Sequence, residues 1–251
     1  MTKAPLRIGM IVPSSNTAFE PAVADMHLPK SDVTIHVSRA RVTSVSLGAG
    51  SQEQFSSDPM CAAALLLADV RPDLLVWAGT SGLWLGLDHD RSVCEALTKA
   101  TSVRATTTTL ALFDACASLG VRRSALVTPY LSEIVDRIVA TCAGAGVSVV
   151  AERHLGLSDN HSFGLVTEKE ISALALACAT SDLDGCLIAC TNLGGPGVVA
   201  ALEQQLGAPV LDSIAVTVWH ALKVAGLAEP GTPQRPGPST PGRARAEIGA
   251  R

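Results

Sequence analysis

Short apolar runs alternate with longer stretches of helical periodicity along most of the chain. The helical patterns are clearest at residues 58–70 and 90–101. Eight apolar runs predict β-strands at residues 7–13, 33–38, 73–79, 103–108, 123–129, 147–152, 185–190 and 209–213. Strands that alternate with helices are typical of α/β proteins with parallel sheets. The pattern therefore predicts an α/β fold.

The second half of the chain repeats the first at a spacing of roughly 115 residues, far longer than a solenoid repeat. The segment IGMIVPSSN (8–16) corresponds to SALVTPYLS (124–132), and PDLLVWAGTSGLWLG (72–86) corresponds to LDGCLIACTNLGGPG (183–197). This alignment pairs Cys190 with Gly79. We therefore predict two pseudo-symmetric flavodoxin-like lobes, each with a parallel four-stranded sheet, and an active site in the inter-lobe cleft. A single continuous eight-stranded sheet would contradict this prediction.

The repeat also predicts a division into domains. The helices that follow the last strand of each half, 109–119 and 214–226, are expected to pack across onto the opposite lobe. Beyond Leu227 the chain is rich in Pro, Gly and Arg and lacks apolar periodicity, which is typical of disorder. The predicted domains are a first α/β lobe (1–108 plus 213–228), a second α/β lobe (109–212) and a disordered tail (229–251).

The amino-acid composition argues against some classes of binding partner. Hydrophobic residues make up 47% of the chain and charged residues 17%, an ordinary balance for a globular protein. A net charge of −4 and an aromatic content of 3% argue against a nucleic-acid surface. No apolar run approaches the ~20 residues that span a bilayer, and the N-terminal apolar segment is too short for a signal peptide. We therefore expect no nucleic-acid or membrane partner, and the sequence leaves a homo-oligomer open.

The cysteine pattern bears on location and cofactors. The seven cysteines, an odd number without a secretory signal, suggest reduced thiols in the cytoplasm. No CxxC or HxxxH pair is present, so we expect no metal site. The GGPG segment at 194–197 lacks the GxGxxG pattern of a dinucleotide site. The sequence therefore predicts a cytoplasmic protein that uses neither a metal nor a cofactor.

Cys190 ends the apolar run GCLIAC and precedes TNLGG. A free cysteine is often a small buried hydrophobe, and this is one interpretation. The other is chemical, because the carboxyl ends of strands in open α/β sheets present residues to ligands. A helix that begins near Gly195 would point backbone N–H groups at the cleft and stabilise a thiolate or a developing enediolate oxygen. We then expect Cys190 to react first with thiol reagents and to be protected by dicarboxylates.

The motifs GMIVPSSN and LVTPY, together with one thiol position per lobe, resemble the aspartate/glutamate racemase superfamily. The branch they resemble contains maleate cis-trans isomerases and arylmalonate decarboxylases, and the resemblance covers about residues 6–227. The resemblance implies one of two arrangements. In racemases and isomerases of this kind, a cysteine from each lobe flanks the substrate. Arylmalonate decarboxylases instead have Gly-Thr-Ser in the first lobe and a single cysteine in the second.

The first-lobe position here is Gly79, in AGTSG. Glycine supplies neither a nucleophile for an alkene nor a second acid or base. The resemblance then implies decarboxylation of a malonate-type substrate, with Cys190 protonating the planar enediolate on one face. Residues of the binding shell match the isomerase pattern instead, namely Asn16, Arg39, Arg41 and Asn160. A maleate-type isomerase, a racemase and a catalytically silent carboxylate-binding protein therefore stay open, and a flavin-binding protein is a weaker alternative.

Each candidate also has a plain structural interpretation. Thr80 and Ser81 follow a strand and could be turn hydroxyls or carboxylate donors in an oxyanion hole. Tyr130 directly follows strand 123–129, and Asn16 could cap a helix or bind a ligand. The candidate site residues are Cys190 as the catalytic group and Asn16, Gly79, Thr80, Ser81, Tyr130, Asn160 and Thr191 as substrate-binding groups.

Other residues are expected to be structural. None of the histidines lies at the end of a predicted strand, and His89 is interpreted as a capping or surface residue. Arg39 and Arg41 are expected to form surface salt bridges. Trp84 is either core between the lobes or an apolar wall against a departing carboxylate.

Overall fold

The computed structural model describes residues 4–26, 28 and 32–227, so the predicted tail at 229–251 lies outside the described residues. The described chain forms two four-stranded parallel sheets, with strand orders β2-β1-β3-β4 and β6-β5-β7-β8. The prediction of two similar parallel sheets rather than one continuous sheet is confirmed. The domain boundaries at 108/109 and 212/213 remain a prediction.

All eight predicted strands are present in the first and second sheets, with ends that differ by up to a few residues. The strands are β1 (Leu6–Pro13), β2 (Val33–Ala40), β3 (Leu74–Trp77), β4 (Ala105–Thr107), β5 (Arg123–Thr128), β6 (Ser148–His154), β7 (Gly185–Ile188) and β8 (Val210–Asp212). The central strands β3 and β7 are buried along their whole length, as expected for parallel strands covered on both faces.

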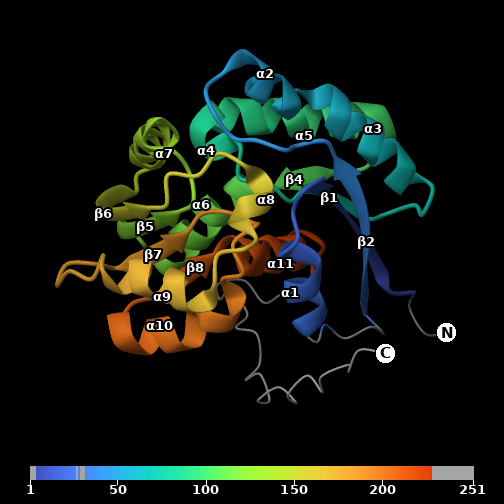
Figure 1. Cartoon of the computed structure of the whole chain (residues 1–251). Coiled ribbons are helices and arrows are strands. Elements are labelled where there is room, and N and C mark those ends of the chain that lie inside the picture. The colour runs from blue at the N-terminus through green and yellow to red at the C-terminus, as the bar shows by residue number, and fades with distance from the viewer. Residues whose placement is uncertain (1–3, 27, 29–31, 228–251) are drawn as a thin grey trace, which may run out of the picture.

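Helices cover both faces of each sheet (Figure 1). In the first half they are α1 (Phe19–Asp25), α2 (Ala49–Gln52), the 3₁₀ turn η1 (Glu53–Phe55), α3 (Ser57–Ala68), α4 (Gly82–Leu85), α5 (Leu87–Thr101) and α6 (Thr108–Leu119). In the second half they are α7 (Ser132–Gly144), α8 (Asn160–Phe163), α9 (Glu168–Leu176), η2 (Pro196–Val198), α10 (Val199–Leu206) and α11 (Ser213–Val224). Figure 1 shows α3 and α5 on one side of the first sheet and α1 and α11 on the other.

The last helix returns to the first lobe, as the sequence predicts for 214–226. Apolar side chains of α11, such as Ile214 and Val218, share a buried cluster with β1, β3 and α1. On its other side α11 packs against α6. There Asp114 accepts hydrogen bonds from Lys223 Nζ at 2.7 and 2.8 Å, and His220 Nδ1 lies 2.9 Å from the same carboxylate. These contacts hold α11 against α6.

Two short strands end directly before turns rather than before helices. β3 ends at Trp77 and β7 ends at Ile188, so Gly79 and Cys190 each lie two residues beyond a strand. Both positions therefore lie at the carboxyl ends of central strands, where ligands meet open α/β sheets. The position of Cys190 at a strand end is confirmed.

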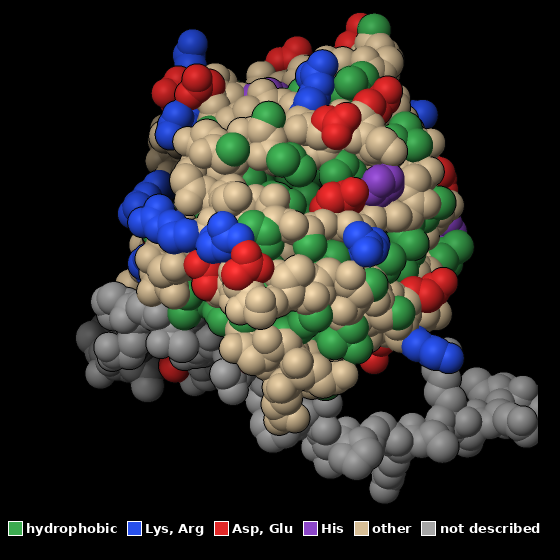
Figure 2. Space-filling model, turned by 90° about the vertical axis from the view of Figure 1, so that its left-hand side faces the viewer, with side chains coloured by type: hydrophobic (Ala, Val, Ile, Leu, Met, Phe, Trp, Pro, Cys, Tyr) green, Lys and Arg blue, Asp and Glu red, His purple; other side chains and the backbone are tan. Residues whose placement is uncertain are grey.

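The outer surface mixes charges. On the face that Figure 2 shows, Lys and Arg side chains are interspersed with Asp and Glu, and hydrophobic side chains are exposed between them. No helix within the described ranges is both long and apolar enough to cross a membrane.

Candidate active site

A small cavity lies between the lobes at the carboxyl ends of both sheets. Its volume is about 20 Å³, enough for roughly one water molecule. Both halves of the chain contribute to its walls. The lining residues are Pro13, Val42, Val45, Phe55, Trp77, Gly79, Thr80, Trp84, Tyr130, Asn160, Cys190 and Thr191. The structure thus brings Gly79, Thr80, Tyr130, Asn160, Cys190 and Thr191 together, whereas Asn16 and Ser81 do not line the cavity.

The Cys190 thiol is buried, with 3% of the residue exposed. Its sulfur accepts a hydrogen bond from the backbone N–H of Asn192 at 3.3 Å. Burial raises the pKa of the Cys190 thiol to about 11, and the charge of Asp212 adds to this. Hydrogen bonds from Tyr130 and from the backbone of Asn192 and Leu193 act in the opposite direction on that pKa. Cys190 is therefore a protonated thiol near neutral pH.

The raised pKa favours the thiol form of Cys190 over the thiolate in the resting site. The helix expected near Gly195 is present, because the 3₁₀ turn η2 begins at Pro196 and continues directly into α10, while the donors to sulfur come from the turn at Asn192 and Leu193. That Cys190 reacts first with thiol reagents remains a prediction, and the burial and raised pKa of the thiol act against it. Cys61 and Cys94 are only partly buried and are more accessible.

Tyr130 links the two lobes at the cavity. Its hydroxyl lies 2.8 Å from the hydroxyl of Thr80, and its ring packs against Trp84 and Phe163 with centroid separations of 5.2 and 5.4 Å. Burial, and then the nearby Cys190 group, raises the pKa of Tyr130 well above its ordinary value. The phenol therefore stays neutral and can donate a hydrogen bond. Trp84 packs edge-on against Phe55 and is both interdomain core and cavity wall.

Ser81 lies outside the cavity lining. Its hydroxyl oxygen accepts a hydrogen bond from Trp77 Nε1 at 3.0 Å, and the residue is fully buried. Because the Ser81 hydroxyl oxygen accepts this bond, its own O–H proton points away from the indole. Its role as an oxyanion donor remains a prediction.

Asn16 bonds to the backbone at the start of α1, whose N-cap residue is Ala18. Its Oδ1 accepts from the backbone N–H groups of Ala18 and Phe19, both at 3.0 Å, at the start of α1. Its Nδ2 donates across the cleft to the carbonyl of Thr191 at 2.9 Å. The Thr191 hydroxyl in turn donates to the carbonyl of Ala78 at 2.9 Å. Asn16 thus fixes the turn that carries Cys190.

Asn160 and Asn192 add to this bond network. Asn160 Nδ2 donates to the hydroxyl of Ser15 at 2.7 Å. Asn192 Oδ1 accepts from the backbone of Thr17 at 2.9 Å, and its amide donates to the carbonyl of Asn160. Asn192 is not among the site residues predicted from the sequence. Its place in TNLGG directly after Cys190 was the available signal.

One wall of the cavity is formed where two loops pair. Ser44 and Asp159 form an isolated antiparallel bridge, Val45 N–H donates to Ser158 at 2.8 Å, and Asn160 N–H donates to Thr43 at 2.9 Å. The first loop carries Val42 and Val45, and the second carries Asn160, so these bonds close the cavity.

The arginines and histidines lie outside the cavity. Arg39 pairs with Glu20, as expected for a surface ion pair, and also donates to the carbonyls of Ser14 and Asn16 at 3.0 and 2.9 Å. His89 lies in the first turn of α5 and is partly buried. β6 extends to His154, so one histidine does end a strand, contrary to the sequence analysis. Its ring bonds to Glu152 and Ser132.

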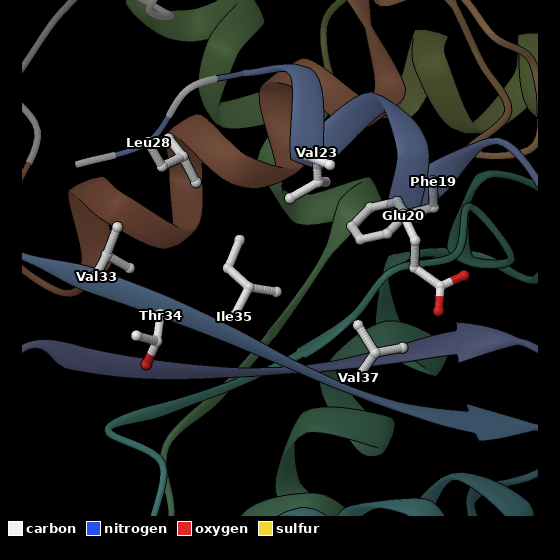
Figure 3. A pocket seen from close by; sticks show the side chains of 9 residues that line it. Phe19, Glu20, Val23, Leu28, Val33, Thr34, Ile35 and Val37 are labelled. Atoms are coloured by element: carbon white, nitrogen blue, oxygen red, sulfur yellow. The ribbon is translucent and has the colours of Figure 1, made fainter. Parts of the chain in front are cut away.

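A larger groove lies elsewhere. Its volume is about 700 Å³, and apolar side chains of α1 and β2 such as Val23, Ile35 and Val37 line it (Figure 3). Its one ionisable lining residue among those described is Glu20, which is paired with Arg39. The small polar cavity is therefore the better candidate site. Across the described residues, no group of three or more His, Cys, Asp or Glu side chains is placed to hold a metal ion.

The two lobes, with a thiol and hydroxyl donors in the cleft between them, define the enzyme class that includes maleate isomerases and arylmalonate decarboxylases. A family model described as arylmalonate decarboxylase matches residues 8–234, and the chain belongs to this family. A maleate isomerase of Nocardia farcinica is 28% identical over 88% of this chain and 90% of its own length. The arylmalonate decarboxylase of Bordetella bronchiseptica is 30% identical over 63% of this chain and 66% of its own length.

Solved structures agree with this assignment. A cysteine-to-alanine variant of the maleate isomerase Iso from Pseudomonas putida S16 with maleate has a TM-score of 0.80 at 26% identity, covering 88% of this chain and 92% of that chain. A liganded variant of arylmalonate decarboxylase, with a glycine changed to cysteine and a cysteine to serine, has a TM-score of 0.78 at 26% identity. It covers 90% of this chain and 96% of that chain.

Asp212 lies close to Cys190 in the fold and was not singled out from the sequence. It is fully buried at the end of β8, which pairs with β7, and its Oδ1 caps α11 by accepting from Ile214 at 2.9 Å and Ala215 at 3.0 Å. Its Oδ2 has no hydrogen-bond partner among the described residues. Burial raises the pKa of Asp212 to about 7, so the group is charged in mildly alkaline solution.

We predict that Asp212→Asn lowers the pKa of the Cys190 thiol, because a negative charge that opposes the thiolate is lost while the helix cap is kept. Alkylation of Cys190 by iodoacetamide at mildly alkaline pH should become roughly two- to fivefold faster, as followed by peptide mass spectrometry. Asp90→Asn is the matched control. Asp90 is the buried carboxyl of the first lobe, and its charge raises the pKa of Cys94 instead. Equal Cys190 alkylation in wild type and Asp212→Asn at every pH would contradict the prediction.

Proposed function

We propose that the protein decarboxylates a small malonate-type dicarboxylate without a cofactor, with Cys190 as the proton donor. The observation that carries this proposal is the asymmetry of the cavity, which has a protonated thiol at Cys190 and no side chain at Gly79. Decarboxylation with protonation on one face needs one acid, whereas two-base racemisation needs two. Attack on an alkene needs a thiolate, which the raised pKa disfavours.

The walls of the cavity suit this chemistry. The hydroxyls of Thr80 and Tyr130 are paired donors for the carboxylate that the product retains. Val42, Val45 and Phe55 form an apolar wall. A carboxylate held against such a wall loses its hydration, whereas neutral CO₂ does not need it. The environment therefore favours departure of the carboxylate on that side.

The proton steps follow from the same contacts. Loss of CO₂ leaves its electron pair on the α-carbon and the retained carboxylate as a planar enediolate. The Cys190 S–H bond then breaks, and its proton goes to the α-carbon. The thiolate that remains is stabilised by hydrogen bonds from the backbone of Asn192 and Leu193. Solvent restores the thiol proton before the next turnover.

A maleate isomerase is the second candidate function. Several relatives carry that name, and Asn16 and Asn160 match the isomerase pattern. Asn16 and Asn160 both make hydrogen bonds within the protein, which weakens this argument. Gly79 supplies no nucleophile for the double bond.

A panel of dicarboxylates followed by proton NMR in D₂O tests the proposal. We expect 2-substituted malonates to give monocarboxylic acids that carry one deuteron at the α-carbon, and maleate to stay unchanged. Conversion of maleate to its trans isomer would support the second candidate and contradict the first. Deuterium exchange without net conversion would indicate a racemase. Binding without any reaction would indicate a silent carboxylate-binding protein.

A further inference from the structure

The indole of Trp77 occupies the volume that a side chain at position 79 would need. A Cβ added to Gly79 would lie 2.5 Å from Cζ2, 2.6 Å from Cε2 and 2.9 Å from Nε1 of Trp77. Real Cβ contacts of this length do not occur, so one group must move. Trp77 and Gly79 both line the cavity that contains Cys190. The missing first-lobe thiol is therefore replaced by an aromatic ring.

Trp77 is held firmly in this position. It is fully buried, and its backbone lies in register with Ile11 on one side and Thr107 on the other, at the end of β3. Its Nε1 donates to the hydroxyl of Ser81 at 3.0 Å. This bond fixes the ring plane and engages the only exchangeable proton of the indole. Trp77 thus offers the cavity a carbon surface and no acid.

We propose that Trp77 is a specificity-determining residue that limits proton delivery to the Cys190 face of the substrate. The proposal rests on the function proposed above. Because Gly79 is the repeat counterpart of Cys190, a group at this position meets the substrate on the side away from the thiol. The indole excludes both a second acid and water from that side. The α-carbon then receives its proton from Cys190 alone, and the product is one enantiomer.

The first test needs no substrate. Gly79→Cys should lower the midpoint of thermal unfolding by roughly 3–10 °C, because the new Cβ overlaps a fixed ring. In a Trp77→Leu background the same change should lower the midpoint little, since the ring is absent. Gly194→Cys is the matched control, because a Cβ there meets nothing within 4 Å. An unchanged midpoint in Gly79→Cys alone would overturn the placement of Trp77 on which the proposal rests.

The second test measures stereochemistry with a 2-substituted malonate that the wild-type protein converts. Trp77→Leu should lower the enantiomeric excess of the product, and Trp77→Leu with Gly79→Cys should also exchange the α-hydrogen of the product acid in D₂O. Trp77→Phe, which keeps a smaller ring, covers the case in which the leucine variant does not fold. Undiminished enantiomeric excess in the Trp77 variants, with no exchange in the double variant, would overturn the proposal.

The two proposals fail in different ways. A wild-type protein that converts no malonate contradicts the decarboxylase function, whatever Trp77 does. In that case the thermal unfolding midpoints of the Gly79→Cys variants alone decide whether Trp77 excludes a side chain from position 79. If the wild-type protein decarboxylates a malonate but the Trp77 variants give the same enantiomeric excess, only the role of Trp77 is contradicted.

Discussion

Cys190→Ala should reduce product formation from a malonate by on the order of 10²–10⁴-fold, because the only acid on the reacting face is removed. Cys190→Ser should leave only a trace, since an alcohol is a much weaker acid than a thiol. Both changes are small in volume at a buried position, so the fold should persist. Turnover measured by NMR, alongside circular dichroism to confirm folding, gives the result.

Cys186→Ala is the matched control for this experiment. Cys186 lies in β7, the same strand that leads to Cys190, and is equally buried. Burial raises the pKa of the Cys186 thiol to about 12, and the residue does not line the cavity. Its loss should affect stability rather than turnover. If Cys190→Ala keeps full activity, the single-thiol mechanism is wrong, and the cavity must be interpreted again as a binding site.

The fold was predictable because its signal is local and repeated. Runs such as RIGMIVP and GCLIAC are apolar because parallel strands are buried on both faces, and the second half of the chain repeats the order of the first. The same repeat placed Gly79 and Cys190 at equivalent strand ends. Proximity of Thr80 and Tyr130 then follows from the rule that carboxyl ends of parallel strands meet at one edge.

The protonation state of Cys190 was not predictable in this way. It depends on burial by the opposite lobe and on the turn at Asn192, neither of which leaves a periodic pattern. The helix expected near Gly195 is present as η2 and α10, but the hydrogen bonds to the Cys190 sulfur come from the turn before it. Sequence supplied the residue but not the environment that sets its pKa.

Side-chain and loop contacts at two further points leave no signal in the sequence. The position of the Trp77 ring over Gly79 depends on a rotamer fixed by Ser81, and no spacing rule reports a rotamer. The cavity wall formed by the loops at Thr43 and Ser158 lies in irregular segments without apolar periodicity. These contacts shape the walls of the cavity.

Tyr130→Phe should lower kcat/KM for the substrate by roughly 10- to 150-fold, the equivalent of about 1.5–3 kcal/mol for a hydrogen bond to a charged group. Phenylalanine keeps the ring contacts with Trp84 and Phe163, so the midpoint of thermal unfolding should change little. The effect should be similar from mildly acidic to mildly alkaline pH. The raised pKa of Tyr130 keeps the phenol protonated throughout that range.

Thr80→Val, combined with Tyr130→Phe in a double-mutant cycle, separates two explanations of that loss. The two hydroxyls lie 2.8 Å apart in the empty site. If they bind the same carboxylate, each single change weakens one shared interaction, and the double variant should lose less than the product of the two single losses. Independent losses would mean that Tyr130 acts on Cys190 instead, by stabilising its thiolate. Unchanged affinity and turnover in Tyr130→Phe would show that the phenol takes no part, and the carboxylate would then have to bind elsewhere in the cavity.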